Sequence, residues 1–429
     1  MAMIDSLLER KLEGLSLPLA VVLPDGHRVG GAKAAITIRL RQISALAHIA
    51  AGEVGKVAQD YVEGKLDFDG SVRDLMQIAS QMIAADPTQD SGGGATLNWW
   101  REIRQNARSR ARHQVQADAQ QVQFHYDVSD AFYELWLDPK RLYSCAYFRD
   151  REMTLAQAQE AKLDHICRKL MLRPGERFLD IGAGWGGLLM WAAEHYGVRA
   201  HGITLSRNQH EHVNRLIDAR GLHGRVTMAL CDYRELPEDA PYDKIASIGM
   251  FEHVGRALLP EYFAKIHRLL RPGGLLMNHG ITAGGTRNHQ LGAGMGDFIE
   301  RYIFPGGELA HVSRVVEVMS EAQFEPLDIE SLRPHYGRTL WAWSDALEAR
   351  LGQARELTSE RVVRAYRVYL AGSAMGFEQG WMGLFQMLAA KPSGQLGDGP
   401  MRGAQSQFPF NRDYMYPRAP AAPGMPPDR

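Results

Sequence analysis

The chain contains little cysteine, with three such residues among 429. Cys145, Cys167 and Cys231 lie far apart and are odd in number, which favours neither a disulfide framework nor a Cys-x-x-Cys metal site, and we expect no metal. Long apolar runs are also missing, since none approaches the roughly 18 residues that span a bilayer. The first residues, MAMIDSLLERKLEG, lack the basic stretch and apolar core of a signal peptide. We therefore expect a cytoplasmic protein with reduced thiols.

A large net charge is absent too. The 49 basic and 50 acidic residues give a formal charge of −1, so no overall field draws the protein to nucleic acid or to an anionic membrane. Any such attraction has to come from a local patch. The composition, with 45% hydrophobic and 23% charged residues, is that of a soluble globular protein. The length is sufficient for two or more domains with a large core.

Composition and pattern divide the chain into four parts. Residues 1–87 mix strand-like runs such as AAITIRL with the helix-like run QIASQMIAA. Residues 88–122 contain a glycine-serine break and then a basic, helix-like segment. Residues 123–392 form the largest part. Residues 393–429, rich in proline, glycine and alanine towards their end, are predicted to be disordered.

The largest part alternates strand and helix, which indicates an α/β domain with a mostly parallel sheet covered on both faces. Residues 286–322 become irregular and then helical, so we expect them to form a cap over the site. The seven expected strands lie near residues 177–183, 199–206, 225–232, 242–249, 273–282, 324–332 and 382–389.

The run DIGAGWGG follows the first of these strands. Its glycines let the backbone pass close to a ligand, although their spacing fits the dinucleotide fingerprint only loosely and a purely structural turn is the alternative. The next strand lacks the terminal acidic residue that usually binds ribose hydroxyls. It ends GITLSRNQ, so Thr204, Ser206 and Gln209 would hold a ligand through neutral hydrogen bonds. The third strand ends CDYRE, which places Asp232 and Tyr233 to meet an adenine.

The chain also lacks a Walker lysine and an obvious pair of Mg²⁺ ligands. A nucleoside without phosphates is therefore favoured, and S-adenosylmethionine (SAM) is the usual one.

Several segments together carry a family resemblance. The runs FHYDVSDAFYELWLDPKRLYSCAYF, LDIGAGWGG, GITLSRNQ and SIGMFEHVG resemble the cyclopropane-fatty-acyl-phospholipid synthase family, which includes the mycolic acid cyclopropane synthases. The match extends over residues 123–388. The run GEVGKVAQDYVEGKLDFDG resembles the extra lipid-interacting domain of the phospholipid-acting branch.

The resemblance implies a class I SAM-methyltransferase (Rossmann-like) fold with a seven-stranded sheet, a helical cap and a smaller N-terminal α+β lipid-interacting domain. The implied activity is addition of a methylene bridge from SAM across cis double bonds of unsaturated phospholipid acyl chains. In this family cysteine usually stands where Ala183 stands here, and alanine is expected to be harmless because the neighbouring backbone binds the cofactor. The resemblance places SAM on Tyr143, Ser144, Gly182, Gly184, Thr204 and Gln209, to which we add Asp180 from the glycine-turn motif, Asp232 and Tyr233.

Cyclopropane formation needs a base, because a proton must leave the transferred methyl group. The resemblance implies a bound bicarbonate in this role. Backbone N–H groups, an imidazole and a phenol can grip such an anion, and Glu252 can accept its proton. Taken alone, Cys145 is typical of a small buried hydrophobe, Glu252 of a helix-start carboxylate and His279 of a satisfied histidine. The implied bicarbonate site comprises Cys145, Glu252, His279, Ile281 and Tyr336.

Methylation of an alkene leaves a carbocation that water would trap, so the pocket must be dry and apolar. Aromatic faces can stabilise the cation. One of the aromatic candidates, Trp185, has an alternative role, which is packing under the helix that follows it. Ser373 matches a cysteine once suspected as a nucleophile, but methyl transfer needs no covalent enzyme intermediate. The aromatic candidates are Tyr147, Phe148, Trp185, Phe251 and Trp341.

The basic segment predicts contact with a membrane surface. Two tryptophans followed by arginines on one helical face are typical of an interfacial anchor on anionic lipid. A solvated linker helix is the alternative, and nucleic acid is disfavoured because no nucleic-acid module is recognised. The residues are Trp99, Trp100, Arg101, Arg104, Arg108 and Arg112.

We therefore expect a peripheral enzyme at the inner face of the membrane, and leave a homodimer open. One rival is a related methyltransferase that makes a methyl-branched or methylene product. Another is a non-catalytic SAM-fold protein that binds lipid or RNA.

Overall fold

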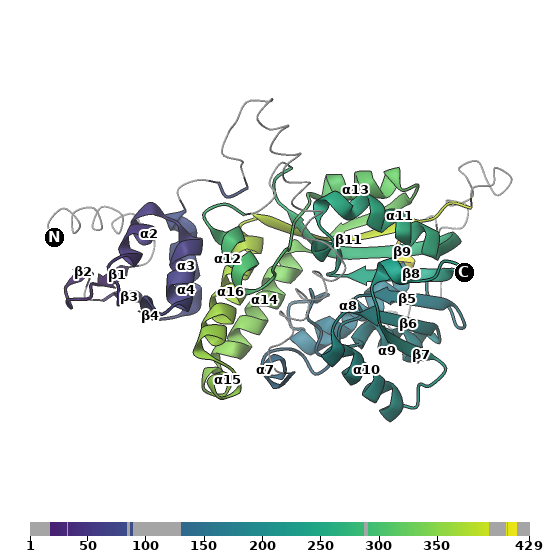
Figure 1. The fold of residues 1–429 in the computed structure, drawn as a ribbon, viewed down its shortest axis with the longest axis horizontal. Helices are drawn as coiled ribbons and strands as arrows, with labels where there is room; N and C mark the ends of the chain where they lie inside the picture. Colours follow the sequence, from purple (N-terminus) through teal and green to yellow (C-terminus); the bar gives the residue numbers. More distant parts are fainter. Residues whose placement is uncertain are drawn as a thin grey trace, which may run out of the picture.

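The computed structural model describes residues 18–31, 33–83, 86–88, 130–286, 291–393, 409 and 411–417. In this part of the chain, a four-stranded sheet belongs to the N-terminal unit and a seven-stranded sheet to the rest. Cap helices lie between the two sheets (Figure 1). The basic segment with its tryptophans lies outside the described residues.

The seven-stranded sheet has the order β10-β11-β9-β8-β5-β6-β7. Strands β9, β8, β5, β6 and β7 pair in parallel, whereas β11 runs antiparallel to both β9 and β10. The mostly parallel sheet is thus confirmed, with one reversed strand. Its strands are β5 (Arg177–Ile181), β6 (Arg199–Thr204), β7 (Val226–Leu230), β8 (Tyr242–Ile248), β9 (Leu270–Ala283), β10 (Glu325–Ser331) and β11 (Met382–Ala390).

Helices cover both faces of this sheet. On β5, Phe178 belongs to the hydrophobic cluster under one set of helices, and its neighbour Leu179 belongs to the cluster under the other set. This division follows from the two-residue period of a strand. One face carries α8 (Leu155–Lys169), α9 (Gly187–Tyr196) and α10 (Arg207–Ala219), and the other carries α11 (Leu259–Leu269) and α13 (Val312–Glu321).

The cap is larger than the sequence predicts. Helix α12 (Met295–Tyr302) falls in the expected 286–322 region, but α13 covers the sheet instead. Three further helices, which our reading of the sequence missed, lie between β10 and β11. They are α14 (Arg333–Glu348), α15 (Leu351–Leu357) and α16 (Glu360–Glu378), and the short α7 (Asp130–Glu134) contacts α15.

The N-terminal unit is α+β, as predicted. Its sheet has the order β2-β1-β3-β4, with β1 and β3 parallel. The elements are β1 (Leu19–Val22), β2 (Arg28–Gly30), β3 (Ile36–Leu40), α2 (Ala45–Ala51), α3 (Val54–Val62), β4 (Leu66–Asp69) and α4 (Val72–Met82).

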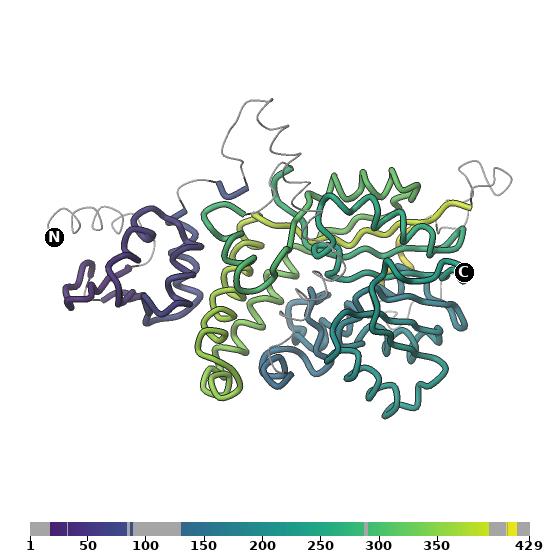
Figure 2. Tube along the Cα trace, viewed as in Figure 1, coloured from purple at the N-terminus to yellow at the C-terminus, as the bar shows by residue number. Residues whose placement is uncertain are grey.

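The N-terminal unit packs on the cap (Figure 2). The N–H of Gly55 on α3 donates to the carbonyl oxygen of Ala293 at 2.9 Å, and a Cβ at Gly55 would lie 2.0 Å from the backbone of Gly294. Only glycine permits so close an approach. At the edge of this contact, Arg364 of α16 pairs with Asp67 at 2.9 Å. The unit is therefore closely fitted to the cap.

The C-terminal tail differs in part from the predicted disorder. Residues 411–417 contain a short 3-10 turn, η6 (Asp413–Met415), in which Met415 is fully buried against α8. His165 contacts the Met415 carbonyl oxygen at 3.1 Å, and Arg412 binds the carbonyl oxygen of Leu327 at 2.6 Å. The buried Met415 and the hydrogen bonds of Arg412 and His165 together hold this segment against the domain. Among the described helices, none is long and apolar enough to cross a membrane.

Candidate active site

A cavity of about 170 Å³ lies at the carboxyl ends of β5, β6 and β8. The order of the sheet reverses at β5, which is where doubly wound sheets bind their ligands. We call this the sheet-edge cavity. It is lined by nine of the residues predicted to hold SAM, which are Tyr143, Ser144, Asp180, Gly182, Gly184, Thr204, Gln209, Asp232 and Tyr233.

The glycine turn shapes one side of this cavity. Gly182, Gly184 and Gly186 have φ angles of 76°, 56° and 81°, in the left-handed region that glycine adopts readily. Between them, the N–H of Ala183 donates to the Ile203 carbonyl oxygen at 2.9 Å. The turn is therefore held by backbone contacts, which fits the expectation that alanine is tolerated at position 183.

Several buried polar atoms in the sheet-edge cavity have no partner among the described residues. Thr204 Oγ1 donates to Gln209 Oε1 at 2.8 Å, which leaves Gln209 Nε2 unpaired, and Asp180 Oδ1 is unpaired as well. Burial raises the pKa of Asp180 to about 7. An unsatisfied buried polar group costs about 1–3 kcal/mol. These groups fit SAM, whose amino-acid end and ribose carry matching donors and acceptors.

Two residues at the strand ends behave differently from the prediction. Asp232 lines the cavity, but its carboxylate also holds the Arg234 side chain at 2.8 and 2.6 Å; spare lone pairs leave it able to accept from an adenine amino group. Ser206 does not line the cavity. Its hydroxyl is the N-cap of α10 and accepts from the N–H of Gln209 at 3.4 Å. The ligand-binding role expected for Ser206 is therefore wrong, and Ser206 instead orients Gln209.

A second, larger cavity of about 270 Å³ adjoins the first. Both are lined by Tyr143, Ser144, Gly249, His253 and Phe304. The second contains all the residues implied to hold bicarbonate: Cys145, Glu252, His279, Ile281 and Tyr336.

Glu252 lies in the short turn η2 (Phe251–His253) and is buried beside β9. Its Oε1 accepts a hydrogen bond from the Ile281 N–H at 2.6 Å, and its Oε2 has no partner among the described residues. Burial raises the pKa of this carboxyl to about 7, although the bond from Ile281 opposes the shift. The group can thus take up or release a proton near neutral pH, as a catalytic acid or base must.

His279, on β9, has 1% of its surface exposed, and neither of its ring nitrogens has a partner among the described residues. Burial, with the nearby Lys162 and Lys169, lowers its pKa to about 3, so the imidazole is neutral and offers one donor and one acceptor. Burial raises the pKa of the Cys145 thiol, which keeps it protonated. Unpaired polar atoms on Glu252 and His279 in one apolar pocket fit a small hydrogen-bonding guest such as bicarbonate.

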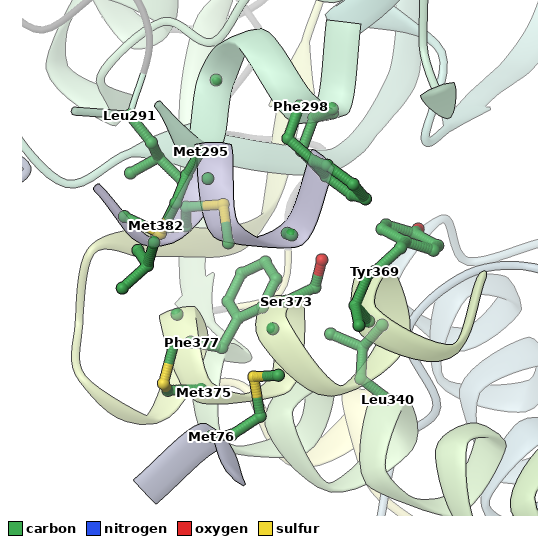
Figure 3. A pocket seen from close by; sticks show the side chains of 18 of the residues that line it. Met76, Leu291, Met295, Phe298, Leu340, Tyr369, Ser373, Met375, Phe377 and Met382 are labelled. Atoms are coloured by element: carbon green, nitrogen blue, oxygen red, sulfur yellow. The ribbon is translucent and has the colours of Figure 1, made fainter. Parts of the chain in front are cut away.

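Beyond this polar cluster the second cavity is lined mainly by apolar side chains, and we call it the apolar cavity. Figure 3 shows its side chains converging from three parts of the chain: Met76 of α4, Met295 of α12, and Met375 of α16. Methionine adapts to irregular apolar shapes. The N-terminal unit therefore forms part of the lining, together with the cap.

None of the proposed cation-stabilising aromatics lines the apolar cavity. Tyr147 stacks between His165 and His335, with ring centroids 4.3 and 4.9 Å away. Trp185 lines the sheet-edge cavity instead, with the Arg141 guanidinium 5.1 Å from its ring centroid. Phe148, Phe251 and Trp341 also lie outside the lining. The phenylalanines and tyrosines that do line the cavity are Tyr61, Phe68, Tyr143, Phe298, Phe304, Tyr336, Tyr369 and Phe377.

Our reading of the sequence missed two parts of the site. Phe304 and Tyr369 line the apolar cavity from segments read as irregular or not assigned at all. Lys162, buried on α8, lines the sheet-edge cavity and donates to Ser144 Oγ at 2.9 Å. A lysine among the buried positions of an amphipathic helix was a signal that could have found it.

Comparison with known proteins identifies the relatives of this chain. The sequence profile described as mycolic acid cyclopropane synthetase matches residues 113–387. The chain belongs to this family. A relative from Pseudomonas putida, named probable fatty acid methyltransferase, is 41% identical over 406 residues, 94% of this chain and 98% of the relative. Cyclopropane mycolic acid synthase 1 of Mycobacterium tuberculosis is 42% identical over 279 residues, 63% of this chain and 96% of the relative.

Solved structures agree with the family assignment. The crystal structure of mycolic acid cyclopropane synthase CmaA1 complexed with SAH and CTAB matches with a TM-score of 0.60 and 40% identity, over 64% of this chain and 98% of that one. Members of the cyclopropane synthetase family share the class I methyltransferase fold seen here. This protein is a SAM-dependent methyltransferase of the cyclopropane synthase family.

The pKa of Glu252 predicts the pH dependence of this methyltransferase. A carboxyl acts as a proton acceptor only when ionised, and a pKa raised to about 7 leaves it protonated below that pH. If Glu252 accepts a proton during turnover, the rate at saturating SAM should therefore rise up to about pH 7 and fall about tenfold per unit below it. The measurement is turnover from pH 5.5 to 9 at fixed bicarbonate concentration. Saturating SAM matters because the pKa of Asp180, in the cofactor site, is also raised to about 7. A flat profile would contradict the role of Glu252.

Proposed function

We propose that this enzyme transfers the methyl group of SAM to a cis double bond in an acyl chain of a membrane phospholipid and closes a cyclopropane ring, with bicarbonate as the base. The observation that carries this proposal is the apolar cavity, which opens onto both the SAM residues and a buried cluster of unpaired polar groups.

The adjoining cavities suit transfer between a polar donor and an apolar acceptor. An alkene is a weak nucleophile, so it must be held in line with the sulfonium methyl group at van der Waals distance, and positioning supplies much of the rate. Tyr143, Ser144 and Phe304 line both cavities and so stand where donor and acceptor would meet. Tyr143 is further fixed by a hydrogen bond to Tyr369 at 3.2 Å.

The reaction balances as net addition of CH₂ to the alkene. One alkene carbon forms a bond to the methyl carbon as the bond between methyl and sulfur breaks, and S-adenosylhomocysteine leaves. The other alkene carbon becomes cationic. Loss of a proton from the methyl group supplies the electron pair that closes the ring. The apolar lining keeps water from the cation, and Tyr336 and Phe304 bring aromatic rings to the same cavity.

The cluster around Glu252 would hold the base. Bound bicarbonate supplies a small oxygen base that takes the methyl proton. Neutral His279 can donate one hydrogen bond to it, and the unpaired Oε2 of Glu252 can accept its proton. The Ile281 N–H fixes the other carboxylate oxygen. The Cys145 thiol, which burial keeps protonated, donates weakly to the carbonyl oxygens of Ala146 at 3.2 Å and Leu332 at 3.9 Å, and it shapes this side of the pocket.

The N-terminal unit is an argument for a phospholipid as the substrate. Its helices α3 and α4 contribute Tyr61 and Met76 to the apolar cavity. The Pseudomonas putida relative covers 94% of the chain and therefore extends over this unit, whereas the mycobacterial relative covers 63%. We infer that the unit helps to bind the acyl chain of a lipid. Peripheral docking at the inner face of the membrane, by the unit or by the basic segment outside the described residues, completes the proposal.

Methyl transfer to vesicles tests this function. The protein is incubated with SAM labelled in its methyl group and with vesicles of a cis-unsaturated phospholipid, and vesicles of the saturated lipid of equal chain length are the matched control. Label is expected in the acyl chains of the unsaturated lipid alone. Label in the headgroup, or in both lipids equally, would contradict an alkene acceptor. No label in either lipid would reject a phospholipid acyl chain as the methyl acceptor.

Bicarbonate is expected to be required for turnover. In buffer stripped of carbon dioxide, activity should fall, and added bicarbonate should restore it. Cys145→Ser places a stronger hydrogen-bonding group in the same pocket and should change the bicarbonate concentration needed for half-maximal rate, with SAM affinity unchanged. The measurement is a bicarbonate titration of both proteins. Identical rates with and without bicarbonate, in both, would point to a protein side chain as the base.

A further inference from the structure

Two buried lysines on α8 differ in their partners. Lys162 and Lys169 are seven residues apart, so they lie on the same side of the helix. Lys169 Nζ lies 3.1 Å from Asp328 and 2.6 Å from Glu330, which together compensate its charge. Lys162 Nζ has one hydrogen bond in the described part of the chain, to the neutral Ser144 Oγ at 2.9 Å. No described carboxylate forms an ion pair with it.

An ammonium group buried without a counter-ion is costly. Lys162 is 2% exposed, and burial lowers its pKa to about 8, which leaves it mostly charged at neutral pH. The nearby Asp138 forms no ion pair with it; the two carboxylate oxygens of Asp138 accept from the N–H groups of Leu142 at 2.8 Å and Lys140 at 2.9 Å. Asp138 and Asp180 both favour the charged form of Lys162 through space, but neither forms an ion pair with it, so the ammonium has no contacting anion among the described residues.

The position of Lys162 indicates which anion this is. Lys162 lines the sheet-edge cavity and not the apolar cavity. Two other cationic side chains line the same cavity and already have partners: Arg141 pairs with Glu134, and Arg234 pairs with Asp232. Among the described lysines and arginines of this cavity, Lys162 is the one that forms no ion pair with a described carboxylate. An acidic group of the cofactor is the natural counterpart.

The amino-acid end of SAM carries one carboxylate and one ammonium group. The unpaired Oδ1 of Asp180, in the same cavity, suits the ammonium. We propose that Lys162, together with the Ser144 hydroxyl that it holds, binds the carboxylate of the amino-acid end of SAM. An ammonium has three N–H donors, so Lys162 can keep its hydrogen bond to Ser144 and still bind the carboxylate. The inference rests on the SAM binding of the proposed function, and neither on its acyl substrate nor on its base.

Calorimetric binding of three ligands tests the proposal without acyl substrate. S-adenosylhomocysteine has the complete amino-acid end. Its decarboxylated analogue, S-adenosyl-3-thiopropylamine, lacks the carboxylate alone, and 5′-methylthioadenosine lacks the whole amino-acid end. Wild-type protein should bind the decarboxylated analogue about 10–100-fold more weakly than S-adenosylhomocysteine, as expected for a hydrogen-bonded charge pair. Equal affinity of the wild type for these two ligands would overturn the proposal, and this measurement needs no variant.

The variant Lys162→Met keeps the apolar stem and removes the charge. It should weaken S-adenosylhomocysteine binding about 10–100-fold while changing the affinity for the other two ligands by less than about threefold. Since the variant loses an uncompensated buried charge, its melting temperature without ligand should not fall. An equal loss for all three ligands would show a structural role, and an unchanged preference for the carboxylate would show that another group binds it. If these binding results are obtained but the vesicles are not methylated, the acyl substrate is rejected and the role of Lys162 stands.

Discussion

Replacing Glu252 with glutamine is expected to lower turnover by about 10²–10⁴-fold, the usual contribution of a placed base. Affinity for SAM should stay within about threefold, because Glu252 lines the apolar cavity and not the sheet-edge cavity. Glutamine keeps an oxygen that can accept from the Ile281 N–H, so the local backbone is preserved. His279→Ala should act in the same direction. The measurement combines turnover with vesicles and calorimetric binding of S-adenosylhomocysteine.

Two further variants sharpen this result. Glu211→Gln makes the same chemical change on an exposed position of α10 and should leave turnover unchanged. Gly280→Ala keeps the carboxylate but displaces it, since a Cβ there would lie 2.2 Å from the Phe251 ring and 2.8 Å from Glu252 Oε1. It should lose most of the activity. Near-normal turnover in Glu252→Gln and His279→Ala together would remove both residues from the mechanism.

Stability separates a catalytic defect from misfolding. The carboxyl of Glu252 has a folded-state pKa of about 7, above its ordinary value, so the folded protein binds this proton more tightly than the unfolded chain. The contribution of Glu252 to stability is then full at low pH and is lost as pH rises through about 7. At pH 8, Glu252→Gln should therefore unfold at a temperature equal to or above that of the wild type.

Filling the apolar cavity should also remove most of the activity. Ser373 lies on α16 and projects among Tyr369, Phe377 and Phe298 (Figure 3). Ser373→Phe would occupy space in the cavity of about 270 Å³ in which we propose that the acyl chain binds. We expect transfer to a long acyl chain to fall about 10²-fold, because a displacement of the reacting carbon by about 1 Å costs that much. S-adenosylhomocysteine binding should be unchanged.

Matched variants control for packing and for chemistry at this position. Ser320→Phe adds the same volume on an exposed turn of α13 and should leave activity intact. Ser373→Ala should retain activity within a few-fold, since no covalent intermediate is expected there. Overpacking costs about 1–3 kcal/mol, so the melting temperature of Ser373→Phe must be measured alongside. A stable Ser373→Phe enzyme with full activity on long chains would show that the acyl chain binds elsewhere.

The sheet and its glycine turn were predictable from the sequence because their signals are local. Strands β5 to β9 read as short apolar runs, and the residues at their carboxyl ends meet at one edge of a parallel sheet whatever surrounds them. Thr204 and Gln209 could be assigned to the cofactor on this basis. Lys162 was missed, although its place among the buried positions of α8 was a signal for it. Only the three-dimensional structure shows that no described carboxylate forms an ion pair with it.

The apolar cavity was not predictable in detail because it is assembled from distant segments. Helices α14 and α16 bury side chains on more than one face, so the one-sided pattern of a surface helix is weak in them. Tyr147 illustrates the same difficulty: it lies next to Ala146 and Cys145 in the sequence, but His165 and His335 stack on it and keep it out of the cavity. The bicarbonate cluster was named through family resemblance, since no spacing in the sequence relates Cys145, Glu252 and Tyr336.

The proposed ring closure is tested most directly by the fate of the methyl hydrogens. The enzyme is incubated with SAM bearing a CD₃ methyl group and with cis-unsaturated phospholipid vesicles, and the acyl product is analysed by mass spectrometry and NMR. We predict a cyclopropane that retains two of the three deuterium atoms, because one leaves to the base, and that shows no olefinic signal. A saturated methyl branch with all three deuterium atoms, or a product that keeps two but has an olefinic methylene, would contradict it.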